Sequence, residues 1–309
     1  MWFLFSLAAM FAWAGSDFFS KRGTRPDDSS SHLKLIVTVG TVMCLHAIVF
    51  ILVTGTKYEL ISLVKYLPVS AMYIVSMAFG YAGLRYIELS VSSPICNSSG
   101  AVVSILCLVF LGQRMEGLQI VGVILICLGV FLLAVLEKRN IDADRRLLLT
   151  APERLAERKY QVSALAIGLP LLYLLLDSAG TFMDIFWLNE ARPILSEEQA
   201  NLSYEFTFAI CAAAAFLYLR FVKGEKFSYR KEGNFDLAAL CETGGQFAYI
   251  YAIADTAHAG MAAPMIGAYC VISVVLSRIF LREKLKLPQY LVIAMTAVGI
   301  VILGVFDAG

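Results

Sequence analysis

The chain has 309 residues, of which 59% are hydrophobic and only 16% are charged, and its formal net charge is +1. Soluble proteins average roughly 45–50% apolar and about 25% charged residues, so this composition excludes an ordinary soluble globular protein. Nucleic acid is not an expected partner, because no basic tract interleaved with aromatic residues is present.

Long apolar segments follow one another along the whole chain. Segments of about 20 residues are needed to cross a hydrocarbon core about 30 Å thick. The first segment lacks the basic start of a cleaved signal peptide, so we interpret it as a membrane span. The sequence therefore predicts an all-α polytopic protein in a lipid bilayer, with spans near 2–20, 33–55, 67–86, 90–111, 117–136, 162–188, 201–221, 235–254, 259–281 and 288–306.

Cysteine and histidine usage gives no sign of a metal site or a cofactor. All seven cysteines lie in apolar segments without a C-x-x-C pair, which is typical of small core residues. The histidines are His32, His46 and His258, which are too few and too scattered for a zinc cluster. We expect no metal and no cofactor.

An internal repeat organises the chain. Residues 94–135 recur without a gap as 264–305, and each copy begins with a proline, Pro94 or Pro264. Each copy crosses a short charged turn and enters an apolar segment that carries a glycine at the same place. Further aligned pairs are Gly129 with Gly299, Gln119 with Gln289, Ala14-Gly15 with Ala179-Gly180, Phe79 with Phe247 and Tyr81 with Tyr249. We therefore expect two five-span copies, 1–136 and 162–309.

Residues 137–161 are expected to join the copies outside the membrane. Thr150-Ala-Pro-Glu153 is a capping box with proline in the first turn, which predicts a short amphipathic surface helix over 151–160. Ser196-Glu-Glu-Gln199 has the same form and should start the seventh span.

The distribution of lysine and arginine predicts the orientation. Most of them lie in the connections after spans 1, 3, 5, 7 and 9, which should therefore face the cytoplasm. Both termini are then on the non-cytoplasmic side. Because five is an odd number, the second copy must be inverted relative to the first, as in many secondary transporters whose substrate site lies near the middle of the membrane.

The turns of the two copies carry a family resemblance. Phe110-Leu-Gly-Gln-Arg114 before Gln119, and Phe280-Leu-Arg-Glu-Lys284 before Gln289, resemble the tandem domains of the drug/metabolite transporter superfamily (EamA-like). That family usually has an acid in this turn; the second copy has Glu283, whereas the first has Gln113. The resemblance implies a ten-helix permease of a bacterial inner or plasma membrane, monomeric or homodimeric, with a small-molecule substrate. It also implies alternating access around a central cavity lined by spans 1, 3, 4, 6, 8 and 9.

Acidic residues inside the spans are the first candidates for a site, because a carboxyl group in a span normally faces a cavity or a partner. Asp177 and Glu242 lie nearest the predicted midplane, and Asp177, Thr181 and Asp184 share one helix face. Such acids can hold a cationic amine, or Asp177, Glu242 and Asp184 can carry a coupling proton. In the structural alternative each acid caps a helix break or bonds a neighbouring Ser, Thr or backbone amide, which we favour for Asp17, Glu205 and Asp255.

Aromatic and amide side chains fall on the same spans. Aromatic rings around a carboxylate bind amines by cation–π attraction, although aromatic residues also simply pack membrane helices. The proline of each copy is either a hinge or a tolerated first-turn proline. Tyr251 is a further aromatic residue on these spans. The candidates are Trp13, Asp17, Tyr73, Tyr81, Asn97, Gln246, Tyr249 and Tyr269 for substrate binding, and Pro94 and Pro264 for the hinges.

Together these features predict a secondary transporter of a small organic solute. A cationic or quaternary amine is favoured, and the alternative is a neutral metabolite such as an amino acid or a nucleoside, with the acids carrying protons. An intramembrane enzyme is disfavoured, because no Ser/His/Asp grouping or metal ligand set lies at depth. A channel or a structural scaffold would be distinguished by the absence of saturable solute exchange.

Overall fold

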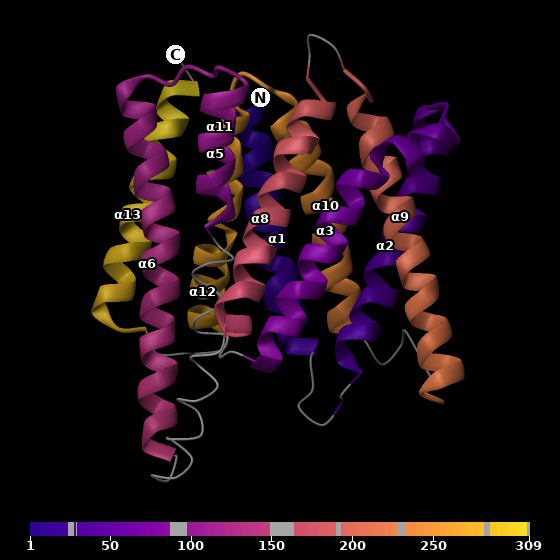
Figure 1. Ribbon diagram of the computed structural model, residues 1–309, viewed down its shortest axis with the longest axis horizontal. Helices are drawn as coiled ribbons and strands as arrows, with labels where there is room; N and C mark the ends of the chain where they lie inside the picture. Colours follow the sequence, from indigo (N-terminus) through magenta and orange to yellow (C-terminus); the bar gives the residue numbers. More distant parts are fainter. Residues whose placement is uncertain are drawn as a thin grey trace. The chain divides into compact units, whose positions relative to one another are not determined.

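The computed structural model describes residues 1–23, 28, 30–86, 98–148, 164–189, 193–225, 227, 233–280 and 285–307. All regular secondary structure in these residues is helical (Figure 1). The elements are α1 (Trp2–Gly23), α2 (Ser31–Thr54), α3 (Leu60–Tyr86), α5 (Ser99–Phe110), α6 (Gly117–Leu148), α8 (Ala164–Trp187), α9 (Glu197–Leu217), the π-helix η1 (Tyr218–Val222), α10 (Gly233–Ala254), α11 (Ala259–Gly267), α12 (Tyr269–Phe280) and α13 (Leu287–Asp307).

These helices occupy the ten predicted apolar segments, with α9 and η1 sharing one segment and α11 and α12 sharing another. Within the described ranges, six segments are long and apolar enough to cross a bilayer by themselves. The prediction of an all-α membrane protein with ten spans is confirmed. The six are Trp2–Gly23, Ser31–Thr54, Gly117–Leu136, Glu197–Val222, Ala259–Phe280 and Leu287–Val305.

Two elements differ from the boundaries expected from sequence. Helix α6 does not end near residue 136 but continues to Leu148, past the end of its neighbour α13 (Figure 1). The expected surface helix over 151–160 and its capping residue Thr150 lie outside the described residues. The ninth span is interrupted at Ala268, between α11 and α12.

The chain forms two compact units, and each contains helices from both halves of the sequence. Unit 1 comprises Met1–Ser70, Phe186–Thr256 and Ile272–Arg282, and includes α1, α2, α9 and α10. Unit 2 comprises Ala71–Ile185, Ala257–Val271 and Glu283–Gly309, and includes α5, α6, α11, α13 and most of α8.

In unit 1, small residues allow close helix packing, α1 on α10 and α2 on α9 and α10. Gly40 on α2 lies against the Phe208 backbone and Ala212 of α9, where a Cβ would have no space. On α1, Gly15 lies against Cys241 of α10. A Cβ atom added at Gly15 would lie 3.0 Å from the Cys241 sulfur.

In unit 2, α6 packs on α13 (Figure 1). Gly129 of α6 lies against Thr296, and Gly299 of α13 lies against Gly122 and Ile126. Partner numbers fall on α13 as they rise on α6, so the helices are antiparallel. Because Gly129 and Gly299 are aligned in the repeat, the last helix of one copy packs on the last helix of the other through reciprocal contacts, as inverted copies require.

The aligned glutamines of the repeat cap these two helices in the same way. Gln119 Oε1 accepts a hydrogen bond from the Glu116 N–H at 2.8 Å, and Gln289 Oε1 accepts one from the Lys286 N–H at 2.9 Å. Each glutamine is the third residue of its helix and satisfies the amide that precedes the helix.

The repeat also contains a second pair of equivalent glycine contacts, one on α1 and one on α8. A Cβ atom added at Gly180 of α8 would lie 3.4 Å from the Tyr73 ring of α3. The sequence alignment pairs Gly15 with Gly180 and, through Phe79 and Phe247, Tyr73 with Cys241. The contact of Gly180 with Tyr73 in unit 2 is therefore the counterpart of the contact of Gly15 with Cys241 in unit 1.

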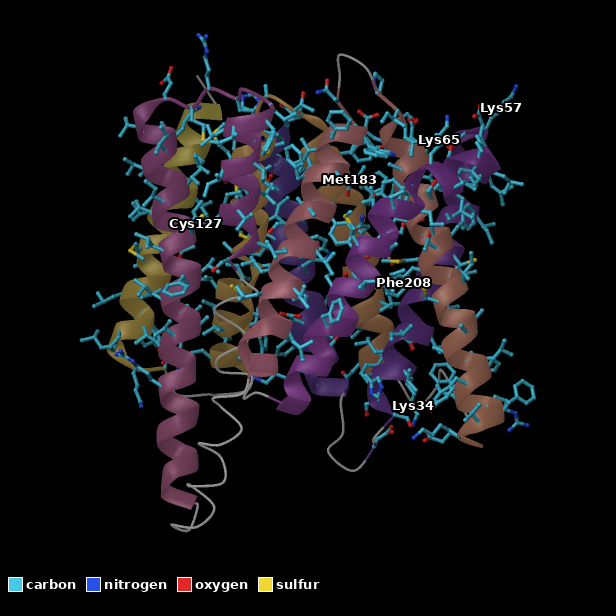
Figure 2. All side chains as sticks on the ribbon, viewed as in Figure 1. Lys34, Lys57, Lys65, Cys127, Met183 and Phe208 are labelled. Carbon is cyan, nitrogen blue, oxygen red and sulfur yellow. The ribbon has the colours of Figure 1, made fainter. Side chains whose placement is uncertain are left out.

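The predicted cap of the seventh span is confirmed. Helix α9 begins at Glu197, and Ser196 Oγ accepts a hydrogen bond from the Gln199 N–H at 3.3 Å. The Gln199 side chain binds the loop between α2 and α3, where it donates to the Lys57 carbonyl at 2.8 Å and accepts from the Glu59 N–H at 3.2 Å. Lys57 is labelled in Figure 2.

Candidate functional site

Two acidic side chains meet where α1 packs on α10 in unit 1. Glu242 is partly exposed and is hydrogen-bonded by the Ser16 side chain, and Asp17 lies close enough to repel it electrostatically. Asp17 is exposed, and its Oδ2 accepts a hydrogen bond from Ser273 Oγ at 3.2 Å. Lys21 attracts Asp17 from one turn further along α1. We call Trp13, Ser16, Asp17, Glu242 and Gln246 the α1–α10 cluster.

The aromatic part of this cluster is Trp13, which packs against a glycine of α10. A Cβ at Gly245 would overlap the Trp13 indole, so this glycine sets the position of the ring. The Trp13 and Tyr249 ring centroids are 5.3 Å apart at 33°. Tyr249 is only 4% exposed, whereas Trp13 is half-buried, so Trp13 is the accessible ring and Tyr249 supports it.

Gln246 brings an amide to the same stripe of α10, one turn from Glu242. Its side chain is 4% exposed, and its Nε2 has no hydrogen-bond partner in the described part of the chain. A buried amide donor without a partner is costly, so a ligand that offers an acceptor oxygen would be stabilised there.

Asp177 lies in unit 2, in a different setting. It is partly exposed, and the Ser99 side chain at the start of α5 hydrogen-bonds to it. Its neighbour Ser178 donates from Oγ to the Ser99 carbonyl at 3.4 Å. A carboxylate near a helix N-terminus is favoured by the unpaired amides and the helix dipole there, so Asp177 also stabilises the first turn of α5.

The predicted face of α8 is divided between two sets of contacts. Asp184 is fully buried, and the Tyr73 hydroxyl shares its proton between Thr181 Oγ1 at 3.0 Å and Asp184 Oδ2 at 3.5 Å. Thr181 and Asp184 are thus brought together with Tyr73, while Asp177 turns to Ser99. Tyr73 belongs to this network through its hydroxyl group, and its part in substrate binding stays a prediction.

The other candidates are dispersed. Tyr269 is the first residue of α12 and is partly exposed in unit 2, and Tyr251 stacks on Phe5 of α1 with centroids 5.4 Å apart. Tyr81 belongs to α3, but its side chain is outside the described residues, as are Asn97 and Pro94. Asp255 lies in the turn after α10, partly exposed.

Pro264 lies inside α11, so the first-turn interpretation does not apply to it. Its missing N–H would have served the Gly260 carbonyl, which instead accepts a hydrogen bond from Ser104 Oγ of α5. The Gly260 N–H donates to Gln113 Oε1 at 3.0 Å. The hinge function of Pro264 stays a prediction, and the helix break itself follows at Ala268, whose N–H donates to the Pro264 carbonyl at 3.1 Å.

One pair of residues was not anticipated from the sequence. Glu205 of α9 is fully buried, and its Oε1 is 2.7 Å from His46 Nδ1 of α2. Asn201 Nδ2 donates to the same oxygen at 3.0 Å. A helix break or a neighbouring Ser, Thr or backbone amide was expected for Glu205, and the two side chains that contact it, His46 and Asn201, are of neither kind. His46 could have been found only by pairing α2 with α9 in the correct register.

Comparisons with known proteins agree with the helical architecture. The model of the EamA-like transporter family matches residues 1–135 and 197–305. A solved structure, described only as the crystal structure of a protein, is similar over 98% of this chain and 96% of its own, with a TM-score of 0.69 and 12% identity. At that identity the likeness concerns the fold alone. Among curated proteins, none matches this chain.

Proposed function

Because the chain belongs to the EamA-like transporter family, whose members carry small molecules across membranes, we propose that its solute is a small organic amine, protonated or quaternary. Transport would be secondary and would proceed by alternating access, and the α1–α10 cluster would hold the solute. An enzymatic function does not follow from this family.

The observation that carries the proposal is the pairing of Asp17 with Glu242 beside Trp13. Two neighbouring carboxylates repel each other, so a cation between them is stabilised. Asp17 is exposed and Trp13 is half-buried, so a solute can reach both. An aromatic face contributes about 0.5–2 kcal/mol to binding a cation, more when water is excluded.

Binding of amines to the purified full-length protein tests the proposal. Tetramethylammonium and phenethylamine should raise the unfolding temperature increasingly with their concentration, because a ligand selective for the folded state stabilises it by mass action. We expect Asp17→Asn and Glu242→Gln each to weaken the affinity at least tenfold, and Trp13→Leu to weaken it less. Saturable exchange of either amine in liposomes would distinguish a carrier from a channel or a scaffold.

Asp177 is the acid that decides between one site and two. If the α1–α10 cluster is sufficient, Asp177→Asn should lower the stability but leave the amine affinity within about twofold. Unchanged amine affinity in both Glu242→Gln and Asp177→Asn would contradict a cation site at either place.

The unpaired amide of Gln246 favours a second candidate, a solute that also carries an acceptor oxygen, such as an amino acid. In this alternative the acids Asp177, Glu242 and Asp184 carry protons. Uptake of leucine that stops when the pH gradient is collapsed, and that ignores tetramethylammonium as a competitor, would support the alternative over the amine.

A further inference from the structure

A carboxyl group with an incomplete set of partners lies between α2 and α9 in unit 1. Glu205 Oε1 has two partners, His46 Nδ1 at 2.7 Å and Asn201 Nδ2 at 3.0 Å. Glu205 Oε2 and Asn201 Oδ1 are buried and have no hydrogen-bond partner among the residues that the structure describes. Glu205 is 0% exposed and Asn201 is 2% exposed, so bulk water does not serve these oxygens.

A proton can complete this set. An ionised carboxylate away from water is stable only when it is hydrogen-bonded and its charge is compensated. With a neutral imidazole the pair carries one uncompensated negative charge. Uptake of one proton gives either an imidazolium beside the Glu205 carboxylate or a neutral imidazole beside a Glu205 carboxylic acid, and in both cases the pair becomes neutral.

His46 is the more accessible member of the pair. The side chain of His46 is 33% exposed, whereas that of Glu205 is not exposed at all. A proton can therefore enter at the accessible imidazole and be shared with the carboxyl group across the 2.7 Å contact. Histidine is suited to this exchange because its unperturbed pKa, about 6.5, is close to neutral.

In the part of the chain that the structure describes, the side chains packed around the pair do not supply the missing positive charge. From α10, the Phe247 ring lies edge-on to His46 with centroids 5.8 Å apart, and Tyr251 lies 4.8 Å from Phe247. From the loop after α2, the Tyr58 hydroxyl bonds to Ser203 at 3.1 Å, and burial raises the pKa of Tyr58. Both tyrosines are neutral near pH 7.

Further carboxylates on α9 lie at its start. Glu197 and Glu198 are in its first turn, where they act electrostatically on Tyr251. Their negative charge would favour proton uptake nearby and cannot replace it. On α2, Lys34 is at the opposite end of the helix from the Lys57 loop (Figure 2) and is paired with Asp28 at 2.6 Å.

We propose that His46 and Glu205 together bind the proton that drives transport, one proton per chain. The inference rests on the proposed function and adds to it a division of tasks, because the acids of the α1–α10 cluster then remain free for the solute. Helix α10 links the two places: Phe247 covers the His46 ring, and Glu242 lies on the same helix where it packs on α1.

Proton binding is tested directly on full-length protein labelled with 15N-histidine. The ring resonances of His46 can be distinguished from those of His32 and His258 by comparison with His46→Gln. We expect His46 to bind its proton with at least tenfold higher affinity in the wild type, where the Glu205 carboxylate lies beside it, than in Glu205→Gln. Equal titration midpoints in the two proteins would overturn the proposal, whatever the solute is.

Coupling is tested in liposomes that contain pyranine, with a tetramethylammonium gradient as the driving force. We expect proton movement in the wild type and its loss in Glu205→Gln and in His46→Gln, while thermal shift still reports tetramethylammonium binding to both variants. Two variants are used because either one alone could fail to fold. If the wild type did not bind the amine, the proposed function would be refuted, and the histidine titration would still test the proton site.

Two further variants complete this test. Tyr58→Phe removes the neighbouring hydrogen bond to Ser203 without touching the pair, and it should retain proton movement. Asp184→Asn removes another carboxyl group that is fully buried among the described residues, and it should also retain proton movement. Proton movement that persists in Glu205→Gln, or that is lost only in Asp184→Asn, would overturn the assignment.

Discussion

Gly129 of α6 lies so close to Thr296 of α13 that a Cβ at position 129 would overlap Thr296 Oγ1. Gly299 is the aligned glycine of the second copy. A Cβ atom added there would lie 2.8 Å from the Gly122 carbonyl oxygen. Because both glycines lie at the α6–α13 contact, the terminal helices of the two copies are held together by their backbones. Small residues are the usual means of such packing in membranes, where apolar area alone does not drive association.

We therefore expect Gly129→Ala to destabilise the protein by about 1–3 kcal/mol, as is typical of overpacking. Thr296→Ala removes the overlapping hydroxyl, so the double variant should be more stable than Gly129→Ala alone. Gly117→Ala is a matched control on α6, because no atom lies within 4 Å of its built Cβ. The measurement is the unfolding temperature in detergent of each of the four variants, compared with that of the wild type. Equal effects of Gly129→Ala and Gly117→Ala would contradict the close contact.

Ser104 compensates for the proline in α11, and this leads to a conditional prediction. Ser104→Ala leaves the Gly260 carbonyl without the hydroxyl that replaces the missing Pro264 N–H, at a cost of about 1–3 kcal/mol. In a Pro264→Ala background the backbone N–H restored at position 264 can serve this carbonyl, so the same substitution should cost much less. Thermal unfolding of the single and double variants gives the coupling. A purely additive result would show that Ser104 stabilises the protein by another route.

Features encoded in local patterns or in the repeat could be predicted from the sequence. The cap at Ser196 follows from hydroxyl and amide spacing, and the paired glycines and glutamines occupy aligned positions. An odd number of spans per copy gave the inversion, which the antiparallel contact between Gly129 and Thr296 illustrates. Each of these depends on neighbours along one helix or on the alignment of the two copies.

The partner of each buried acid could not be predicted, because it depends on helix register. A shift of α2 by one residue along α9 would separate His46 from Glu205. The amino-acid sequence of the two segments does not by itself specify this register. Similarly, the sequence spacing placed Asp184 and Asp177 on one helix face. In the structure α8 packs against α3, and Asp184 accepts a hydrogen bond from Tyr73. Depth in the membrane ranked the acids, whereas side-chain partners determine their roles.

The loop before α2 should give a pH-dependent stability. Partial burial raises the pKa of Asp28, but hydrogen bonds from Lys34 and from the Ser30 N–H outweigh it, so the pKa is lowered overall. A lowered pKa means stability that is present above the unfolded value, about 3.9, and is lost as the pH falls through the folded value. Asp28→Asn should therefore cost about 1 kcal/mol at pH 7.

Unfolding temperatures measured from pH 7 to pH 3 test this prediction. The difference between the wild type and Asp28→Asn should shrink as the pH falls below about 4, because below the lowered pKa of Asp28 both proteins carry an uncharged side chain at position 28. A difference that is constant across this range would show that the carboxylate charge is not what stabilises the loop.

The adjacent glycines of α10 allow the α1–α10 cluster to be tested without changing its charges. Gly245→Ala should displace the Trp13 indole, because the new Cβ would overlap the ring. It should weaken tetramethylammonium binding about two- to thirtyfold, which corresponds to the loss of roughly 0.5–2 kcal/mol of cation–π attraction. Gly244→Ala makes the same chemical change one residue away, where no atom lies within 4 Å, and should leave binding unchanged. Affinities from thermal shift compare the two variants, and the fluorescence that differs between the wild type and Trp13→Leu is an independent readout of the position of the Trp13 ring. If both variants bind tetramethylammonium as the wild type does while the fluorescence of Gly245→Ala changes, the ring moves but does not contact the amine, and Trp13 is then a packing residue.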